Sequence, residues 1–148
     1  MKTQINRLES VQPLADMALE IRYAGGQVMR VDFSELAERF TVFADLQKPD
    51  FFRAAAVTDW GHTLEWPNGE GLDADRVMEM ALEQAGRVDT LEFRRWQERN
   101  HLSLTDAAEA IGLTRRTVSQ YRTGARPVPR TVTLACKGWE VERHHAPA

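Results

Sequence analysis

Residues 102–124 read Leu-Ser-Leu-Thr-Asp-Ala-Ala-Glu-Ala-Ile-Gly-Leu-Thr-Arg-Arg-Thr-Val-Ser-Gln-Tyr-Arg-Thr-Gly, and this stretch predicts two short helices joined by a tight turn. Ser103 can cap the first helix, because the first backbone N–H groups of a helix have no internal partner and a serine hydroxyl can accept from them. Gly112 should end that helix, since glycine adopts a positive φ without steric cost. Thr114 is placed to cap the second helix, which Gly124 ends.

The apolar residues of this stretch fall on one side of each predicted helix. Ala107, Ala108 and Ile111 form the side of the first helix that we expect to be buried. Val118 and Tyr121, at i and i+3, form the corresponding side of the second helix. The opposite face of the second helix carries arginine, serine and glutamine, and it has no acidic residue.

That polar face has the composition expected of a helix that reads DNA. An arginine can offer two hydrogen bonds to a guanine edge and a glutamine two to an adenine edge. A helix-turn-helix places the N-terminal residues of its second helix against the bases. The alternative is an ordinary amphipathic helix pair with a solvated charged face, which is commoner among proteins at large. We favour DNA binding because the cap and glycine spacing is complete, and because residues 124–130 add two more arginines.

Residues 90–139 resemble the lambda-repressor-like (Xre-type) helix-turn-helix domain, in which five helices surround a small core and the third reads DNA. The resemblance implies an all-α five-helix domain over residues 90–140, with a recognition helix at about 115–122 in the major groove. Arg122 departs from the pattern, because many relatives have an acid there. The resemblance and the exposed face together imply base contacts from Arg115, Arg116, Ser119 and Gln120, and phosphate contacts from Thr105, Thr114, Thr117, Arg122, Arg126 and Arg130.

The rest of this region predicts two further helices. Residues 91–100 should form a helix with Phe93 and Trp96 in the core, and with Arg94, Arg95 and Arg99 facing out. A last helix should begin at Val128-Pro129, since proline suits the first helical position. The apolar residues of this helix that should face the core are Val132, Ala135, Cys136 and Trp139. Residues 141–148 are expected to form a frayed tail.

Charge divides the chain into two parts. Residues 1–89 contain 9 Lys+Arg and 16 Asp+Glu, whereas residues 90–148 contain 10 Lys+Arg and 6 Asp+Glu. An acidic front and a basic back fit one part that avoids phosphates and one that meets them. No run approaches the roughly 20 apolar residues of a membrane span. The single cysteine excludes an internal disulfide and, with a polar N-terminus, predicts a reducing cytoplasmic location.

The front part predicts antiparallel strands and short helices. Residues 17–33 alternate with a period of two about a turn at Ala24-Gly25-Gly26, which is typical of a β-hairpin. A second hairpin is expected from residues 53–58 and 62–66. A short helix should follow Ser34 as its cap, and a longer one should run from Asp73 to Gly86. The first ten residues fit either a loose arm or an edge strand, and residues 86–90 are a candidate linker.

The order of these elements, with Trp66-Pro67-Asn68-Gly69 and Leu72-Asp73, resembles the bacterial domain of unknown function 2442 family over residues 11–85. The resemblance implies an α+β fold with antiparallel strands and no known chemistry. Turn and cap requirements explain the signature residues. The whole chain is therefore expected to be α+β, with a small antiparallel β/α domain at residues 1–86 followed by the helix-turn-helix domain.

These features predict a sequence-specific transcriptional regulator that binds double-stranded DNA. A homodimer is expected, because one small module contacts few base pairs and two copies can bind a palindrome. The acidic front would supply the dimer contact or bind a protein partner. The alternative is an antitoxin-like protein-interaction module with an auxiliary helix-turn-helix.

We expect no enzyme, no cofactor and no metal site. Asp59, His62 and Glu65 could act as catalytic groups only inside a water-excluding pocket. The sequence contains no glycine-rich phosphate loop, zinc spacing or nucleophile motif. His144 and His145 are expected to be solvated tail residues.

Overall fold

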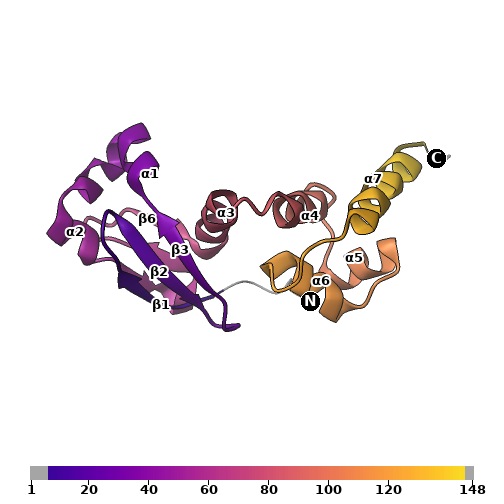
Figure 1. The fold of residues 1–148 in the computed structure, drawn as a ribbon, viewed down its shortest axis with the longest axis horizontal. Coiled ribbons are helices and arrows are strands. Elements are labelled where there is room, and N and C mark those ends of the chain that lie inside the picture. The colour runs from indigo at the N-terminus through magenta and orange to yellow at the C-terminus, as the bar shows by residue number, and fades with distance from the viewer. Residues whose placement is uncertain (1–6, 146–148) are drawn as a thin grey trace. The chain divides into compact units, whose positions relative to one another are not determined.

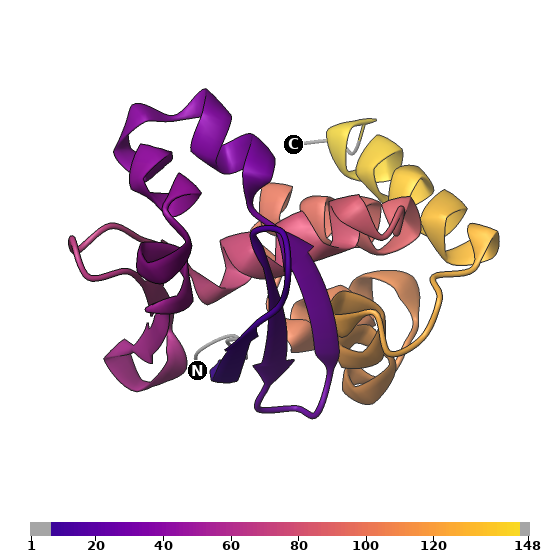
Figure 2. The ribbon, with the colours of Figure 1, turned by 60° about the vertical axis from the view of Figure 1, so that its left-hand side comes forward.

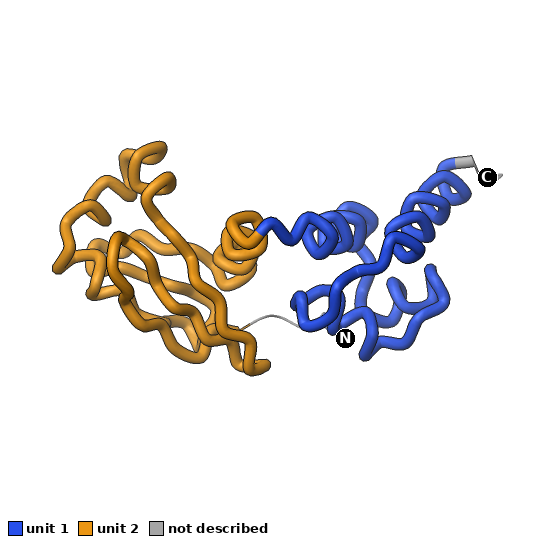
Figure 3. Tube along the Cα trace, viewed as in Figure 1, with its two compact units in different colours: residues 1–4, 86–148 blue, residues 5–85 orange. Residues whose placement is uncertain are grey.

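The chain forms two compact units, drawn in different colours in Figure 3. The computed structural model describes residues 7–145. Residues 5–85 form one unit, called here the β unit, and residues 86–148 belong to the other, called here the helical unit. An antiparallel β-sheet region followed by several helices confirms the predicted α+β class (Figure 1). Among the described residues, no helix combines the length and apolar character needed to cross a bilayer.

The first sheet of the β unit is an antiparallel meander of three strands (Figure 2). Leu19, Ile21 and Tyr23 alternate inward along the central strand and are buried, as predicted. The strand at residues 8–13 pairs with it, so the edge-strand interpretation is correct for residues 8–10. In chain order the strands are β1 (Leu8–Pro13), β2 (Ala18–Tyr23) and β3 (Val28–Asp32).

The second sheet is also an antiparallel meander. The predicted second hairpin is present, but its first strand is short because Pro49–Arg53 forms a helix. A third strand, which the sequence did not predict, follows the turn at residues 67–70. The strands are β4 (Ala56–Thr58), β5 (Thr63–Glu65) and β6 (Gly71–Asp73).

Trp66 organises the core of the β unit. Its ring lies against Phe33, Phe43 and Phe52 with centroid separations of 5.5–6.3 Å. Its indole Nε1 donates to the backbone carbonyl of Phe52 at 3.1 Å, so its polar atom is satisfied in the core. The helical segments of the unit are α1 (Ser34–Arg39), η1 (Thr41–Gln47), α2 (Pro49–Arg53), η2 (Asp59–Gly61) and α3 (Ala74–Gln84).

The other signature residues of this region shape turns and helix ends. The Asn68 carboxamide oxygen accepts from the Glu70 N–H at 3.0 Å, which closes the turn after Trp66. The Asp73 carboxylate caps α3 by accepting from the Arg76 N–H at 2.7 Å. The predicted structural role of the signature is therefore confirmed for Trp66, Asn68 and Asp73.

Ser34 does not cap α1, which corrects the sequence prediction. Ser34 is the first residue of the helix, and its own N–H donates to the Asp32 carboxylate at 2.7 Å. An aspartate commonly accepts from the backbone two residues later, and this local bond sets the start of α1 in place of a serine cap. The Asp32 backbone is also held by Gln84 of α3, whose side-chain amide accepts from its N–H and donates to its carbonyl.

The helical unit contains four helices in its described residues, where the resemblance implied five. No helix forms between residues 124 and 129, since Pro127 and Pro129 lack the N–H groups that a helix needs. Buried side chains from its described residues form the core, among them Phe93, Trp96 and Val118. The helices are α4 (Val88–Arg99), α5 (Leu104–Ile111), α6 (Arg115–Thr123) and α7 (Arg130–His145).

The ends of this unit differ from the predicted boundaries. α4 begins at Val88, so the candidate linker at residues 86–90 is partly helical. α7 begins at Arg130, and the Pro129 carbonyl accepts from its first turn. The frayed tail predicted for residues 141–148 is wrong as far as His145, because α7 continues with Arg143 stacked on the Trp139 ring at 5.0 Å. Residues 146–148 lie outside the described part.

Cys136 is buried in the core of the helical unit, as predicted, whereas Ala135 is exposed. Burial raises the pKa of the Cys136 thiol to about 12. The thiol is therefore protonated at neutral pH, which fits a packing role.

Candidate nucleic-acid interface

The turn between α5 and α6 has the local geometry that the sequence predicted. The Ser103 hydroxyl caps α5 by accepting from the Asp106 N–H at 3.0 Å. Gly112 ends α5 with a left-handed φ of 72°, which a residue with a side chain rarely adopts. The Thr114 hydroxyl then caps α6 by accepting from the Thr117 N–H at 3.1 Å. These caps fix the direction in which α6 leaves the turn.

Arg115 and Arg116 are exposed in the first turn of α6, as predicted. The inner side of the same helix carries Val118 and Tyr121, which are buried in the core of the helical unit. No acidic residue lies in the first turn. The N-terminal end of α6 therefore combines two guanidinium groups with the positive end of the helix dipole.

The next turn of α6 is partly covered. Ser119 and Gln120 are half-buried. The Gln120 carboxamide oxygen accepts from the Arg126 guanidinium at 3.3 Å, and the Gln120 carbonyl accepts from the Arg126 N–H at 3.2 Å. The Arg126 guanidinium also lies 5.7 Å from the centre of the Tyr121 ring. A base contact from Gln120 therefore requires Arg126 to release its amide oxygen.

The remaining predicted contacts surround this helix end. Thr105 at the start of α5 is exposed, and so are Arg126 and Arg130 after α6. Thr114 is exposed while its hydroxyl caps α6, and Thr117 is half-buried beside it. These residues and the exposed arginines of α6 all belong to the helical unit.

Arg122 does not face solvent, which contradicts its predicted phosphate contact. Its side chain is only 8% exposed. Its guanidinium donates to the Gln97 carboxamide oxygen at 3.1 Å and lies 3.8 Å from the Glu98 carboxylate. Because α4 packs over the C-terminal half of α6, this arginine joins the two helices.

Arg94 was also predicted to face out, and it is instead 1% exposed. Its guanidinium donates to the Arg122 carbonyl at 2.8 Å, so it holds the last turn of α6 against α4. Thr90, Arg94 and Gln97 are all buried at spacings i, i+4 and i+7 on α4. That polar stripe is the sequence signal for this network, and Gln97 completes it by donating to the Leu102 carbonyl.

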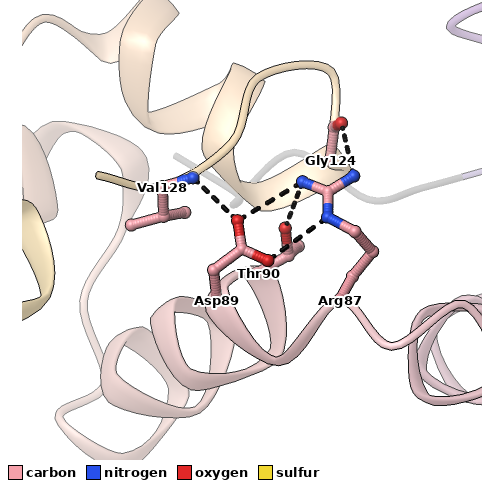
Figure 4. A network of polar contacts seen from close by, with 5 residues as sticks. All are labelled: Arg87, Asp89, Thr90, Gly124 and Val128. Carbon is pink, nitrogen blue, oxygen red and sulfur yellow. Dashed lines mark hydrogen bonds and ion pairs between the residues drawn. The ribbon is translucent and has the colours of Figure 1, made fainter. Parts of the chain in front are cut away.

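A second network holds the chain that follows α6 (Figure 4). The Arg87 guanidinium donates to the Gly124 carbonyl at 3.2 Å and to both oxygens of the Asp89 carboxylate. The Asp89 carboxylate accepts from the Val128 N–H at 2.8 Å, and Thr90 accepts from Arg87 at 3.0 Å. These bonds span both ends of the loop that carries Arg126.

A third contact joins the C-terminal end of α4 to α7. The Arg99 guanidinium donates two hydrogen bonds of 2.8–2.9 Å to the Glu140 carboxylate, and the Asn100 side chain donates to the same group. The bond from Arg99 holds the pKa of Glu140 below its ordinary value. Burial alone raises the pKa of Asp89, but the bonds from Arg87 and Val128 outweigh burial and lower it.

The helical unit is expected to lose stability in acid. Both carboxylates have a folded-state pKa below the unfolded values of 4.5 for Glu140 and 3.8 for Asp89. Their contribution is therefore present above those values and is lost as the pH falls through the folded ones. The free energy of unfolding should fall as the pH drops below the unfolded values, and Glu140→Gln should weaken that pH dependence.

Urea unfolding followed by circular dichroism at each pH measures this effect. The matched control is Glu109→Gln, which changes an exposed glutamate of α5 and should keep the wild-type pH dependence. The same acid response in wild type and Glu140→Gln would show that the Arg99 pair contributes nothing.

Asp59, His62 and Glu65 do not form a water-excluding site. The Asp59 side chain is 67% exposed and lies 3.8 Å from the His62 ring. The Glu65 carboxylate accepts instead from the Thr58 hydroxyl at 3.0 Å. The three groups therefore lack the enclosed pocket that shared catalysis requires.

Comparison with known proteins finds a similar solved structure and a family model that matches the β unit. A crystal structure from Nitrosomonas europaea, of a protein named a "Putative DNA Binding Protein", is 38% identical in sequence. The similarity covers 97% of this chain and 92% of that one, with a TM-score of 0.71. No curated protein matches the chain. The family described as "Protein of unknown function (DUF2442)" matches residues 8–82, just over half of the chain, and the chain therefore belongs to the DUF2442 family.

Proposed function

We propose that this chain is a sequence-specific DNA-binding regulator of transcription and that its helical unit is an Xre-type helix-turn-helix domain. The observation that carries the proposal is the capped N-terminus of α6, which presents Arg115 and Arg116 to solvent while Val118 anchors the helix in the core. The Nitrosomonas europaea protein, named for DNA binding, adds support from similarity along nearly the whole chain.

The proposed complex places α6 in the major groove. Arg115 and Arg116 would each offer two parallel hydrogen bonds to a guanine edge. Ser119 lies one turn further along the same helix and can bond to several bases. Gln120 would reach an adenine edge once Arg126 turns from its amide oxygen toward the backbone of the DNA.

The proposed phosphate contacts surround that helix end. The first N–H groups of α6 and the positive end of its dipole favour a phosphate near the cap. Arg126 and Arg130 are exposed on the loop after α6 and on the first turn of α7. The residues proposed to contact phosphates are Thr105, Thr114, Thr117, Arg126 and Arg130.

Replacing a phosphate-contacting arginine should weaken binding to every DNA sequence alike. Arg126→Ala or Arg130→Ala should each make the negative slope of log K against log salt shallower by about 0.9, because one fewer counterion is released. Fluorescence anisotropy of a labelled duplex over a salt series measures that slope.

Arg53→Ala provides the control, because it removes an exposed arginine from the β unit and should leave the slope unchanged. A slope that is the same in wild type, Arg126→Ala and Arg130→Ala would place the phosphates elsewhere on the protein. A wild type with no salt-dependent affinity for duplex DNA would remove the proposed function itself.

We propose three further properties with this function. The chain acts in the cytoplasm, it acts by binding without catalysing a reaction, and it binds DNA as a homodimer. We propose a dimer because one module reads few base pairs and each correct pair adds only about 1–3 kcal/mol of discrimination. Two modules on one site would double the number of base pairs that are read.

One observation favours the alternative of an antitoxin-like protein-interaction module. Trp60 of the β unit is 87% exposed, in a turn where Asp59, Trp60 and Gly61 all have positive φ. Tryptophan is among the residues enriched at the centres of protein interfaces. A protein partner that binds the wild type and not Trp60→Ala, with DNA affinity unchanged, would assign that role to the β unit.

A further inference from the structure

α7 has an apolar side that faces away from the core of the helical unit. Leu134 is 50% exposed and Val141 is 59% exposed, although Val132 and Cys136 of the same helix are buried. Leu134, Gly138 and Val141 are spaced i, i+4 and i+7, so they lie on one face of the helix (yellow in Figure 1). This exposed face of α7 is therefore continuous over two helical turns.

Gly138 lies at the centre of this face, where no described residue packs against it. Glycine inside a helix costs about 1 kcal/mol relative to alanine. A Cβ added at Gly138 would meet no atom within 4 Å, so packing inside the described chain does not require a glycine. A missing side chain does allow another backbone to approach closely. The position thus points to a second helix lying across it.

We propose that the α7 helix of a second copy of this chain packs in parallel against this face, forming a two-fold dimer. The inference rests on the proposed DNA-binding function, because the dimer would present two copies of α6 to a palindromic site. In this arrangement Leu134 and Val141 meet their counterparts, and Gly138 lets the helices approach between them. Thr131 takes the equivalent position one turn before Leu134.

Charge selects the parallel orientation. Lys137 and Glu142 flank the apolar residues on opposite sides, at the positions that precede Gly138 and follow Val141. In a parallel pair of helices, a residue that precedes the apolar face lies beside the residue five positions later in the partner helix. This arrangement places Lys137 beside Glu142 of the partner subunit. In an antiparallel pair, residues on the same side of the apolar face lie beside each other. Arg130 and Lys137 would then approach the same basic residues of the partner.

The contact is short, so the dimer should dissociate on dilution. Leu134 and Val141 supply its only two large apolar layers. A palindromic duplex that binds both α6 helices would strengthen the dimer, because the second binding event then becomes intramolecular.

Sedimentation of the full chain over a concentration series tests the surface. Wild type should show a reversible monomer–dimer equilibrium. Leu134→Lys should raise the dimer dissociation constant by about tenfold or more, since it places a charge in the apolar contact. Val88→Lys is the matched control, because it changes a 58% exposed valine of α4 and should leave the equilibrium unchanged.

Charge exchange tests the orientation. Lys137→Glu and Glu142→Lys should each weaken the dimer, and the double variant should restore it. A monomeric wild type at every concentration, an unchanged dimer in Leu134→Lys, or a double variant no stronger than the single ones would each overturn the proposal.

DNA binding separates this inference from the proposed function. Leu134→Lys should bind a duplex containing one half-site as wild type does and should lose the extra affinity for two half-sites. A wild-type dimer that binds no duplex would defeat the proposed function and leave the dimer surface in place.

Discussion

Arg122→Ala is expected to lower the free energy of unfolding of the helical unit by about 1–3 kcal/mol, the cost of leaving a buried polar group without its partner. The Gln97 carboxamide oxygen loses the donor at 3.1 Å, and Glu98 loses a guanidinium at 3.8 Å. Removal of a side chain that is 8% exposed also leaves space between α4 and α6. Urea unfolding followed by circular dichroism measures the change.

Arg126→Ala is the control for this experiment. Arg126 lies four residues later and is exposed, so its removal should change stability by no more than about 0.5 kcal/mol. The two variants should therefore differ in their effects: Arg122→Ala should lower stability, and Arg126→Ala should lower DNA affinity. If Arg122→Ala has wild-type stability and a shallower slope of log K against log salt, Arg122 contacts a phosphate as the sequence predicted.

Arg115→Ala and Arg116→Ala are each expected to cost about 1–3 kcal/mol of discrimination between the preferred base pair and the others, the value of one bidentate contact. Both side chains are exposed at the capped end of α6, so stability should stay close to that of wild type. Competition titrations with duplexes that differ at single base pairs measure the loss and locate the affected position.

Arg115→Lys and Arg116→Lys are matched controls for charge. Lysine keeps the positive charge but lacks the planar fork that makes two parallel hydrogen bonds. These variants should retain affinity for non-specific duplex DNA and lose most of the base preference. Full base preference in the lysine variants would show that the two arginines act only as charges.

The sequence predicted those parts of the candidate interface that depend on local rules. Ser103, Gly112, Thr114 and Gly124 occupy the predicted ends of α5 and α6, because a cap or a left-handed glycine is decided by residues within one turn. The inward positions of Val118 and Tyr121 followed from helical spacing and from their apolar side chains.

The parts that depend on contacts between distant segments were not predictable in the same way. Arg94 and Arg122 lie 28 residues apart in the chain, and their burial follows from the packing of α4 on α6. Arginine is rarely buried unless it is paired, so each side chain considered alone was expected in solvent. The spacing of Thr90, Arg94 and Gln97 at i, i+4 and i+7 places them on one face of α4, but their polar side chains did not identify that face as buried.

Short elements of the β unit were hard to predict for the same reason, because contacts with distant segments determine them. β6 contains three residues, which is too few for a period of two to be recognised. Its position is set by pairing with β5, where Leu72 lies opposite Leu64. The start of α1 depended on a choice between two nearby acceptors, and Asp32 prevails over the Ser34 hydroxyl.

Selection of bound sequences from a pool of random duplex DNA, at a stated salt concentration, tests the central claim most directly. The account predicts that the full chain enriches one short motif, repeated as a palindrome, and that Arg115→Ala with Arg116→Ala removes the preference at defined positions of that motif. A pool that stays random after selection with wild type, or a motif that is identical for wild type and the double variant, would contradict it.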